Sequence, residues 1–87
     1  YNQKKVGSLS DVSIFSFYGN KTITTGEGGM ICFKSKISYD YAKILRDHGM
    51  NRSKKYWHDF IGHNFRLTNL QAAIGCVQLK KLNRIVI

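Results

Sequence analysis

The chain has 87 residues, a hydrophobic share of 43% and a formal net charge of +9, with 14 Lys and Arg residues against 5 Asp and Glu. This length allows one small domain at most, and the hydrophobic share argues against a disordered tail. No stretch approaches the roughly 18 apolar residues of a membrane span, and no apolar run follows the N-terminal lysines. These features predict an internal piece of a soluble, cytoplasmic protein.

The positive charge suggests an anionic partner, which is nucleic acid, an anionic membrane or a phosphate-bearing small molecule. Basic residues gather only in short groups, at residues 4–5, 52–55 and 80–84, and none forms a continuous stripe on a helix face. We therefore expect no membrane or nucleic-acid partner. A small basic nucleic-acid-binding module stays open as the alternative function.

Residues 11–17 alternate polar and apolar side chains and are rich in β-branched and aromatic types, which predicts a strand. Residues 18–20 end this strand, and Lys21 follows directly. Residues 26–29 are three glycines and a glutamate, typical of a tight turn, and residues 30–33 form a short apolar run. The pattern predicts two buried strands joined by a loop that carries Lys21.

Residues 38–47 are predicted to form a helix with Ser38 as the N-cap and one apolar face. That face consists of Ile37, Tyr41, Ile44 and Leu45. His48 and Gly49 follow, and the glycine suits a left-handed C-cap. Residues 51–64 show no period and are expected to form a loop, which at this length is usually functional.

Thr68 and Gln71 fit a capping box, in which each side chain bonds the other residue's backbone N–H. Apolar residues recur at helical spacing from Leu70 onward, and cations fall near the end of the run, where they suit the helix dipole. We expect a helix over residues 68–85 that belongs to the core and to a dimer scaffold.

Cys32 and Cys76 lie far apart in apolar runs, so we expect buried free thiols rather than a zinc site or a disulfide framework. His48, His58 and His63 have no recognisable ligand spacing, so no metal is expected.

Lys21 is the candidate for covalent chemistry. Burial between two strands would disfavour its ammonium form and make the amine a nucleophile towards an aldehyde cofactor. Ser16 and the hydroxyls of Thr22, Thr24 and Thr25 could face a phosphate, and the glycines would allow a close backbone approach.

The stretch from Ser16 to Gly29 reads Ser-Phe-x-x-x-Lys-x-x-x-x-Gly-Glu-Gly-Gly. It closely resembles the signature of the DegT-type sugar aminotransferases, which are fold-type-I pyridoxal-phosphate enzymes. Residues 46–49 (Arg-Asp-His-Gly) and residues 61–75 resemble two further blocks of this family. Within the family, residues 17–30 and 55–59 look most like the perosamine synthases.

The resemblance implies an α/β fold, with residues 1–87 as the central part of the cofactor-binding large domain, truncated at both ends. Lys21 would bind pyridoxal 5'-phosphate covalently and act as general acid and base, and Ser16 would bind the cofactor phosphate. Asn64 would reach the cofactor phosphate of the neighbouring subunit in a homodimer. The dehydratase branch of the family has histidine at the position of Lys21, so Lys21 favours transamination.

The implied reaction is amination of a 4-keto-6-deoxy nucleotide sugar with glutamate as the amino donor, as in GDP-perosamine synthesis for the lipopolysaccharide O-antigen. A fragment of this length would be inactive alone. Tyr56 and Trp57, beside the basic residues 52–55, could stack a nucleotide base and pair a diphosphate, or could pack within the loop. Arg66 is expected to pair with a carboxylate and receives no catalytic role.

Overall fold

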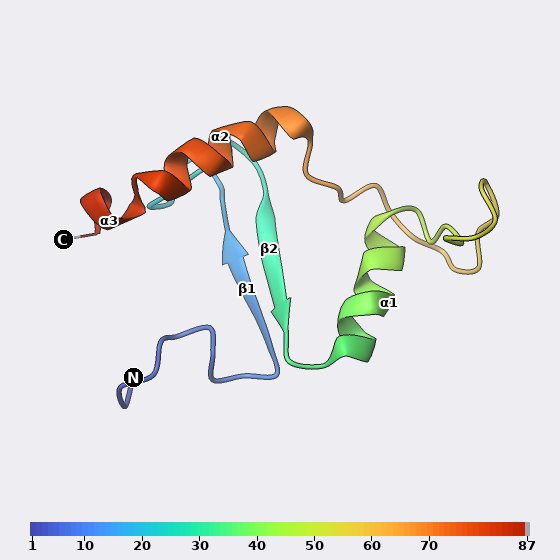
Figure 1. The fold of residues 1–87 in the computed structure, drawn as a ribbon, viewed down its shortest axis with the longest axis horizontal. Helices are drawn as coiled ribbons and strands as arrows, with labels where there is room; N and C mark the ends of the chain where they lie inside the picture. The colour runs from blue at the N-terminus through green and yellow to red at the C-terminus, as the bar shows by residue number, and fades with distance from the viewer. Residues whose placement is uncertain (87) are drawn as a thin grey trace. The chain divides into compact units, whose positions relative to one another are not determined.

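The computed structural model describes residues 1–86 and contains two strands followed by three helices (Figure 1). Strands β1 (Val12–Ser16) and β2 (Gly29–Phe33) pair in a two-stranded sheet. The N–H of Phe17 donates to the Gly28 carbonyl at one end, and the N–H of Lys34 donates to the Asp11 carbonyl at the other. This pairing makes the strands antiparallel, as the opposed arrows in Figure 1 show. Both predicted strands are therefore confirmed.

Helix α1 (Lys36–Arg46) begins before the position that the sequence pattern predicts. Its N-cap is Ser35, whose Oγ accepts a hydrogen bond from the N–H of Ser38, so Ser38 lies inside the first turn. Choosing Ser38 as the cap was wrong because two serines three residues apart both suit the role, and the hydrogen bond selects the first.

The end of α1 uses two left-handed residues. His48 has φ +62° and Gly49 has φ +66°, and the N–H of Gly49 donates to the Ile44 carbonyl. The sequence predicts this conformation for the glycine, which is confirmed, but not for the histidine. A second left-handed residue turns the chain sharply away from the helix axis.

Helix α2 (Asn69–Lys80) starts at the predicted capping box, with Thr68 as N-cap and Gln71 as its partner, and α3 (Leu82–Ile85) adds one short turn. Lys81 separates the two helices. The expected helix over residues 68–85 is thus confirmed with a break near its end.

The described chain divides into two compact units. The first, called the loop unit here, comprises Tyr1–Val12 and Cys32–Arg66. The second, the lysine unit, comprises Ser13–Ile31 and the described part of Leu67–Ile87. Each unit joins segments that lie far apart in the sequence.

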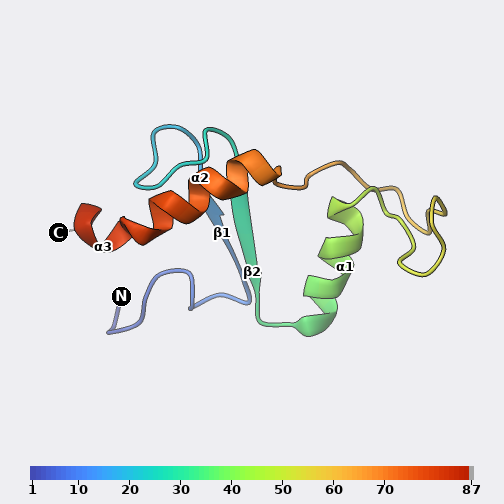
Figure 2. The same ribbon diagram turned by 45° about the horizontal axis from the view of Figure 1, so that its top comes forward.

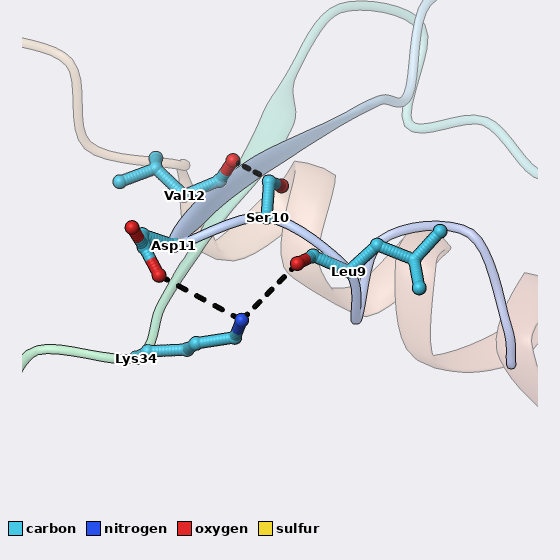
Figure 3. A network of polar contacts seen from close by, with 5 residues as sticks. All are labelled: Leu9, Ser10, Asp11, Val12 and Lys34. Atoms are coloured by element: carbon cyan, nitrogen blue, oxygen red, sulfur yellow. Dashed lines mark hydrogen bonds and ion pairs between the residues drawn. The ribbon is translucent and has the colours of Figure 1, made fainter.

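In the loop unit, Lys34 ties the N-terminal segment to the residues that follow β2 (Figure 3). Its Nζ donates to the Leu9 carbonyl at 3.2 Å and lies 3.7 Å from the Asp11 carboxylate. Both side chains are well exposed, so the ion pair itself contributes little, and the backbone hydrogen bond between Lys34 and Asp11 provides most of the attachment.

The apolar side chains of residues 1–86 are at most partly buried. Among residues 1–86 no hydrophobic side chain is buried, and Thr25, at 6% exposure, is the one buried polar residue. The expectation of buried strands was wrong for this reason, because a two-stranded sheet covered by one helix leaves most of its surface open. Cys32 and Cys76 are free thiols, as expected, but both are exposed rather than buried.

No helix among the described residues is long and apolar enough to cross a membrane.

Candidate active site

Lys21 lies in the connection between β1 and β2, in the lysine unit, and its side chain is exposed. Its N–H donates to the Tyr18 carbonyl at 3.0 Å, so residues 18–21 form a turn that fixes where the side chain leaves the backbone. The expected desolvation of this lysine was wrong, because the strands that flank it leave it open to solvent. The amine contacts no carboxylate or carbonyl oxygen in the part of the chain that the structure describes.

Ser16 is the last residue of β1, and its Oγ accepts a hydrogen bond from the N–H of Tyr18 at 3.3 Å. The hydroxyl proton has no acceptor among residues 1–86, so it is free to donate to an anion. Ser16 and Lys21 therefore stand on either side of one short turn, with a hydroxyl donor and an amine both accessible.

Two of the three threonines that follow Lys21 serve the loop rather than a ligand. Thr24 Oγ1 donates to the Phe17 carbonyl at 2.9 Å, and Thr25 Oγ1 donates to the Glu27 carbonyl at 2.7 Å. The expectation that these two hydroxyls face a phosphate was wrong, because each proton already has a backbone acceptor. Their hydrogen bonds close the loop at its base, since the N–H of Thr25 also donates to Phe17.

Two glutamines of α2 contact this loop from outside, and Figure 2 shows the helix beside the β1–β2 connection. Gln78 Oε1 accepts from the N–H of Thr24 at 3.4 Å, and Gln71 Nε2 donates to the Glu27 carbonyl at 3.1 Å. This role was not predicted, because the sequence pattern indicates Gln71 as a helix cap alone and does not single out Gln78. The signal present was the seven-residue spacing, which places both side chains on one helix face.

An apolar cleft of about 480 Å³ lies between α2 and the strand–loop segment within the lysine unit. Its apolar lining includes Phe15, Phe17, Ile23, Met30, Leu67 and Leu79. The hydrogen bonds of Gln71 and Gln78 therefore link α2 to the Lys21 loop beside this cleft.

Asn64 belongs to the loop unit, where it lies beside the end of α1. It forms an antiparallel bridge with Asp47, and the N–H groups of His63 and Phe65 on either side donate to the carbonyls of Leu45 and Arg46. The backbone of Asn64 is thus fixed by α1, while its side chain is exposed.

Arg66 has the carboxylate partner that the sequence analysis expected. Its guanidinium Nη1 lies 3.3 Å from Asp47 Oδ1. That carboxylate oxygen is buried and makes no aligned hydrogen bond, so the contact is an ion pair. It adds a second tie between α1 and the segment that carries Asn64.

The aromatic residues of the loop after α1 remain on the surface, with 76% of Tyr56 and 53% of Trp57 exposed. Lys54 Nζ lies 4.0 Å from the Trp57 ring centroid, and Lys55 Nζ lies 5.0 Å from that of Tyr56. Each ring therefore has a cation of its own loop over it, which supports packing within the loop.

The three histidines do not converge on a metal site. His58 Nδ1 bonds the His48 carbonyl at 2.8 Å, and the His63 ring stacks on Phe65 with centroids 4.8 Å apart. No group of three or more potential ligands comes together among the described residues.

One protein family matches this chain over its full length. The sequence profile of the DegT/DnrJ/EryC1/StrS aminotransferase family matches residues 1–87. The GDP-perosamine synthase of Vibrio cholerae is 52% identical over 85 residues, which are 98% of this chain and 23% of that protein. The chain thus spans less than a quarter of this relative.

Solved structures agree on the fold. Helicobacter pylori PseC, an aminotransferase involved in the biosynthesis of pseudoaminic acid, superposes with a TM-score of 0.88 at 41% identity. The alignment covers 97% of this chain and 23% of PseC. The PLP form of Spr1654 from Streptococcus pneumoniae gives a TM-score of 0.82 at 30% identity, with 97% and 23% of the two chains covered. The fold is that of part of the α/β domain of fold-type-I aminotransferases, and the chain belongs to the DegT/DnrJ/EryC1/StrS aminotransferase family.

Proposed function

We propose that this chain is the central part of the large domain of a pyridoxal-phosphate-dependent aminotransferase that aminates a nucleotide sugar. The observation that carries the proposal is Lys21, an exposed amine without a partner among the described residues, at the lysine position of the family signature. Lysine rather than histidine at this position favours transamination over dehydration.

The residues around Lys21 fit pyridoxal 5'-phosphate. An aldehyde needs an amine that no other group holds, and a phosphate needs hydroxyl or N–H donors. Lys21 supplies the amine, and Ser16 supplies a hydroxyl whose proton is free. Ser16 ends β1 and Lys21 ends the turn that follows it, so a single small ligand that carries both groups could engage both residues.

Each residue then has a defined task. The Lys21 amine would hold the cofactor through its aldehyde and would move a proton at the carbon next to the transferred nitrogen. Ser16 Oγ orients the phosphate. When bound, the cofactor supplies an electron sink for that proton transfer. Asn64 donates its amide to the cofactor phosphate of the neighbouring subunit in a cytoplasmic homodimer.

The acceptor we propose is a GDP-linked 4-keto-6-deoxy sugar, with glutamate as the amino donor, as in perosamine synthesis for the O-antigen. The 52% identity to the Vibrio cholerae GDP-perosamine synthase supports this choice over other keto-sugars. A nucleic-acid-binding module has no comparable support, because the family profile that matches residues 1–87 is that of an aminotransferase family. Three of the 14 basic side chains, those of Lys34, Lys36 and Arg66, are in addition paired with carboxylates.

Borohydride reduction of the full-length protein with cofactor, followed by peptide mapping, tests the site. The label is expected on Lys21, and Lys21→Ala is expected to lose labelling and to lower transamination by several orders of magnitude. Lys34→Ala is the matched control, because this lysine is held by Asp11 and the Leu9 carbonyl and should leave labelling unchanged. Label on another lysine would disprove the site assignment.

The substrate is tested separately by offering GDP- and UDP-linked 4-keto-6-deoxy sugars with glutamate or another amino acid as donor. The proposal predicts the highest kcat/KM for the GDP sugar with glutamate. A preference for a UDP sugar would leave Lys21 as the cofactor residue and overturn the perosamine assignment.

A further inference from the structure

The contacts between α2 and the Lys21 loop assign a task to two residues that do not touch the proposed cofactor site. Gln71 and Gln78 are seven residues apart on one face of α2. They bond the Glu27 carbonyl and the Thr24 N–H respectively. The two glutamines thus hold both ends of the four-residue segment 24–27, which begins three residues after Lys21.

That segment is also bonded inward, towards the turn itself. The Phe17 carbonyl accepts from Thr24 Oγ1 and from the N–H of Thr25, and the N–H of Phe17 donates to the Gly28 carbonyl. Phe17 is next to Tyr18, whose carbonyl receives the N–H of Lys21. Hydrogen bonds therefore connect α2 to Thr24, Thr24 to Phe17, and Tyr18 to Lys21, and the peptide link between Phe17 and Tyr18 joins them into one path.

Gly75 lies between the two glutamines on the same face and allows the close approach. A Cβ at this position would lie 3.0 Å from Thr25 Cγ2, and Thr25 is the buried polar residue of the described chain. The Thr25 hydroxyl shares the Glu27 carbonyl with Gln71 Nε2. Helix and loop thus meet at a small residue flanked by two directed hydrogen bonds.

We infer that Gln71 and Gln78 are positioning residues that fix the Lys21 loop against α2 and so determine where the Lys21 amine points. The inference rests on the proposed role of Lys21 for its functional meaning. The two glutamines act in opposite senses, since Gln71 donates a hydrogen bond to the loop and Gln78 accepts one from it. This asymmetry allows the two contacts to be tested independently.

Amide hydrogen exchange of the full-length apo protein measures the loop directly. Gln71→Glu keeps the acceptor that caps Thr68 but loses the donor to Glu27, so exchange over residues 24–28 should rise about fivefold, as expected for the loss of one hydrogen bond. Gln78→Leu should raise it about twofold, since the 3.4 Å contact is the longer one. Gln78→Glu keeps an acceptor for Thr24 and should restore the wild-type rate. Lys80→Ala, on the same helix, is the control.

The holo protein provides a second measurement, which a general loss of stability would not change. In Gln71→Glu the visible circular dichroism of the bound cofactor should fall while its absorbance stays constant, because a looser loop averages the cofactor's orientation. Unchanged exchange in both Gln71→Glu and Gln78→Leu, or equal exchange in Gln78→Glu and Gln78→Leu, would overturn the inference. Exchange in the apo protein does not depend on the cofactor, so failure of the proposed function would be seen separately, in the labelling of Lys21.

Discussion

The Lys21 loop and the loop after α1 are both irregular connections, yet their hydrogen bonds span very different distances along the chain. In the lysine unit, Thr24 bonds Gln78 and Glu27 bonds Gln71, pairs that are 54 and 44 residues apart. In the loop unit, Asn51 bonds Ser53, Lys54 and Asp59, which lie two to eight residues away. The first loop is held by a helix far along the chain as well as by its own residues, whereas the second is held by its own residues and by the adjoining helix α1.

This difference bears on function. A loop that is held by a distant helix can be moved by changes in that helix, so the position of Lys21 depends on α2. The loop after α1 is instead held by residues near it in the sequence. The Asn51 side chain accepts from Ser53 and Lys54 and donates to Asp59, and the Phe60 ring contacts Tyr41 of α1. The effects of substitutions on hydrogen exchange should therefore reach different parts of the chain in the two loops.

The largest effect is expected from Gly49→Ala. Gly49 has φ +66°, and a Cβ there would lie 2.0 Å from the Phe60 carbonyl oxygen, which cannot retreat because it belongs to the backbone. Strain and overlap together should cost about 3 kcal/mol or more, so hydrogen exchange over residues 48–63 should rise about a hundredfold. Gly26→Ala is the control in the Lys21 loop, since φ is +80° and nothing lies within 4 Å.

Gly26→Ala should cost about 1 kcal/mol from backbone strain alone, which is about a fivefold rise in exchange. Equal effects of the two substitutions would mean that the loop shifts and relieves the overlap with Phe60. The larger cost predicted for Gly49→Ala would then be wrong.

An intermediate effect is expected from Asn51→Ala, which removes the acceptor for two backbone N–H groups and the donor to Asp59. The cost should be about 2 kcal/mol, seen as faster exchange of the Ser53 and Lys54 amides. Asn51→Asp keeps the acceptor and should protect these amides better than alanine does. Faster exchange at Thr24 or Thr25 in either variant would contradict the independence of the two loops.

The smallest effect is expected at the Lys36–Asp40 pair on α1. The hydrogen bond from Lys36 is the main cause that lowers the pKa of Asp40 below its usual 3.8. A carboxyl pKa that is lowered on folding stabilises the folded state at pH values above the pKa of the unfolded chain. This contribution is lost as the pH falls through the pKa of the folded state. Asp40→Asn should therefore abolish a slight acid dependence of exchange in α1. Salt should weaken the wild-type effect, and a pair insensitive to both salt and pH would contribute nothing.

Much of the local structure follows from the residues themselves. The Thr68–Gln71 capping box starts α2 where the sequence predicts, because its hydrogen bonds join residues only three apart. Alternation over residues 11–17 predicts β1 for the same local reason. The choice between Ser35 and Ser38 as the cap of α1 failed, because both serines satisfy the local rule and geometry decides between them.

At the candidate site, too, some features could be predicted from the sequence and others could not. The resemblance of residues 16–29 to the family signature singles out Lys21 as the candidate, because that pattern carries its lysine at this position. The roles of Thr24, Thr25 and Gln78 could not be predicted, since a hydroxyl or an amide has many possible partners until a second segment lies beside it. The burial expected for Lys21 failed because burial depends on what covers the strands.

By itself, the sequence determined the order of the elements, the start of α2, and Lys21 as the one lysine in the family position. All of these depend on residues a few positions apart. The tertiary structure decided that α2 lies against the Lys21 loop, that Thr25 is buried while Lys21 is exposed, and that Gln71 and Gln78 bond the loop from opposite ends. The physical reason is that a hydrogen bond between residues 44 or 54 positions apart exists only once folding has brought the two segments together.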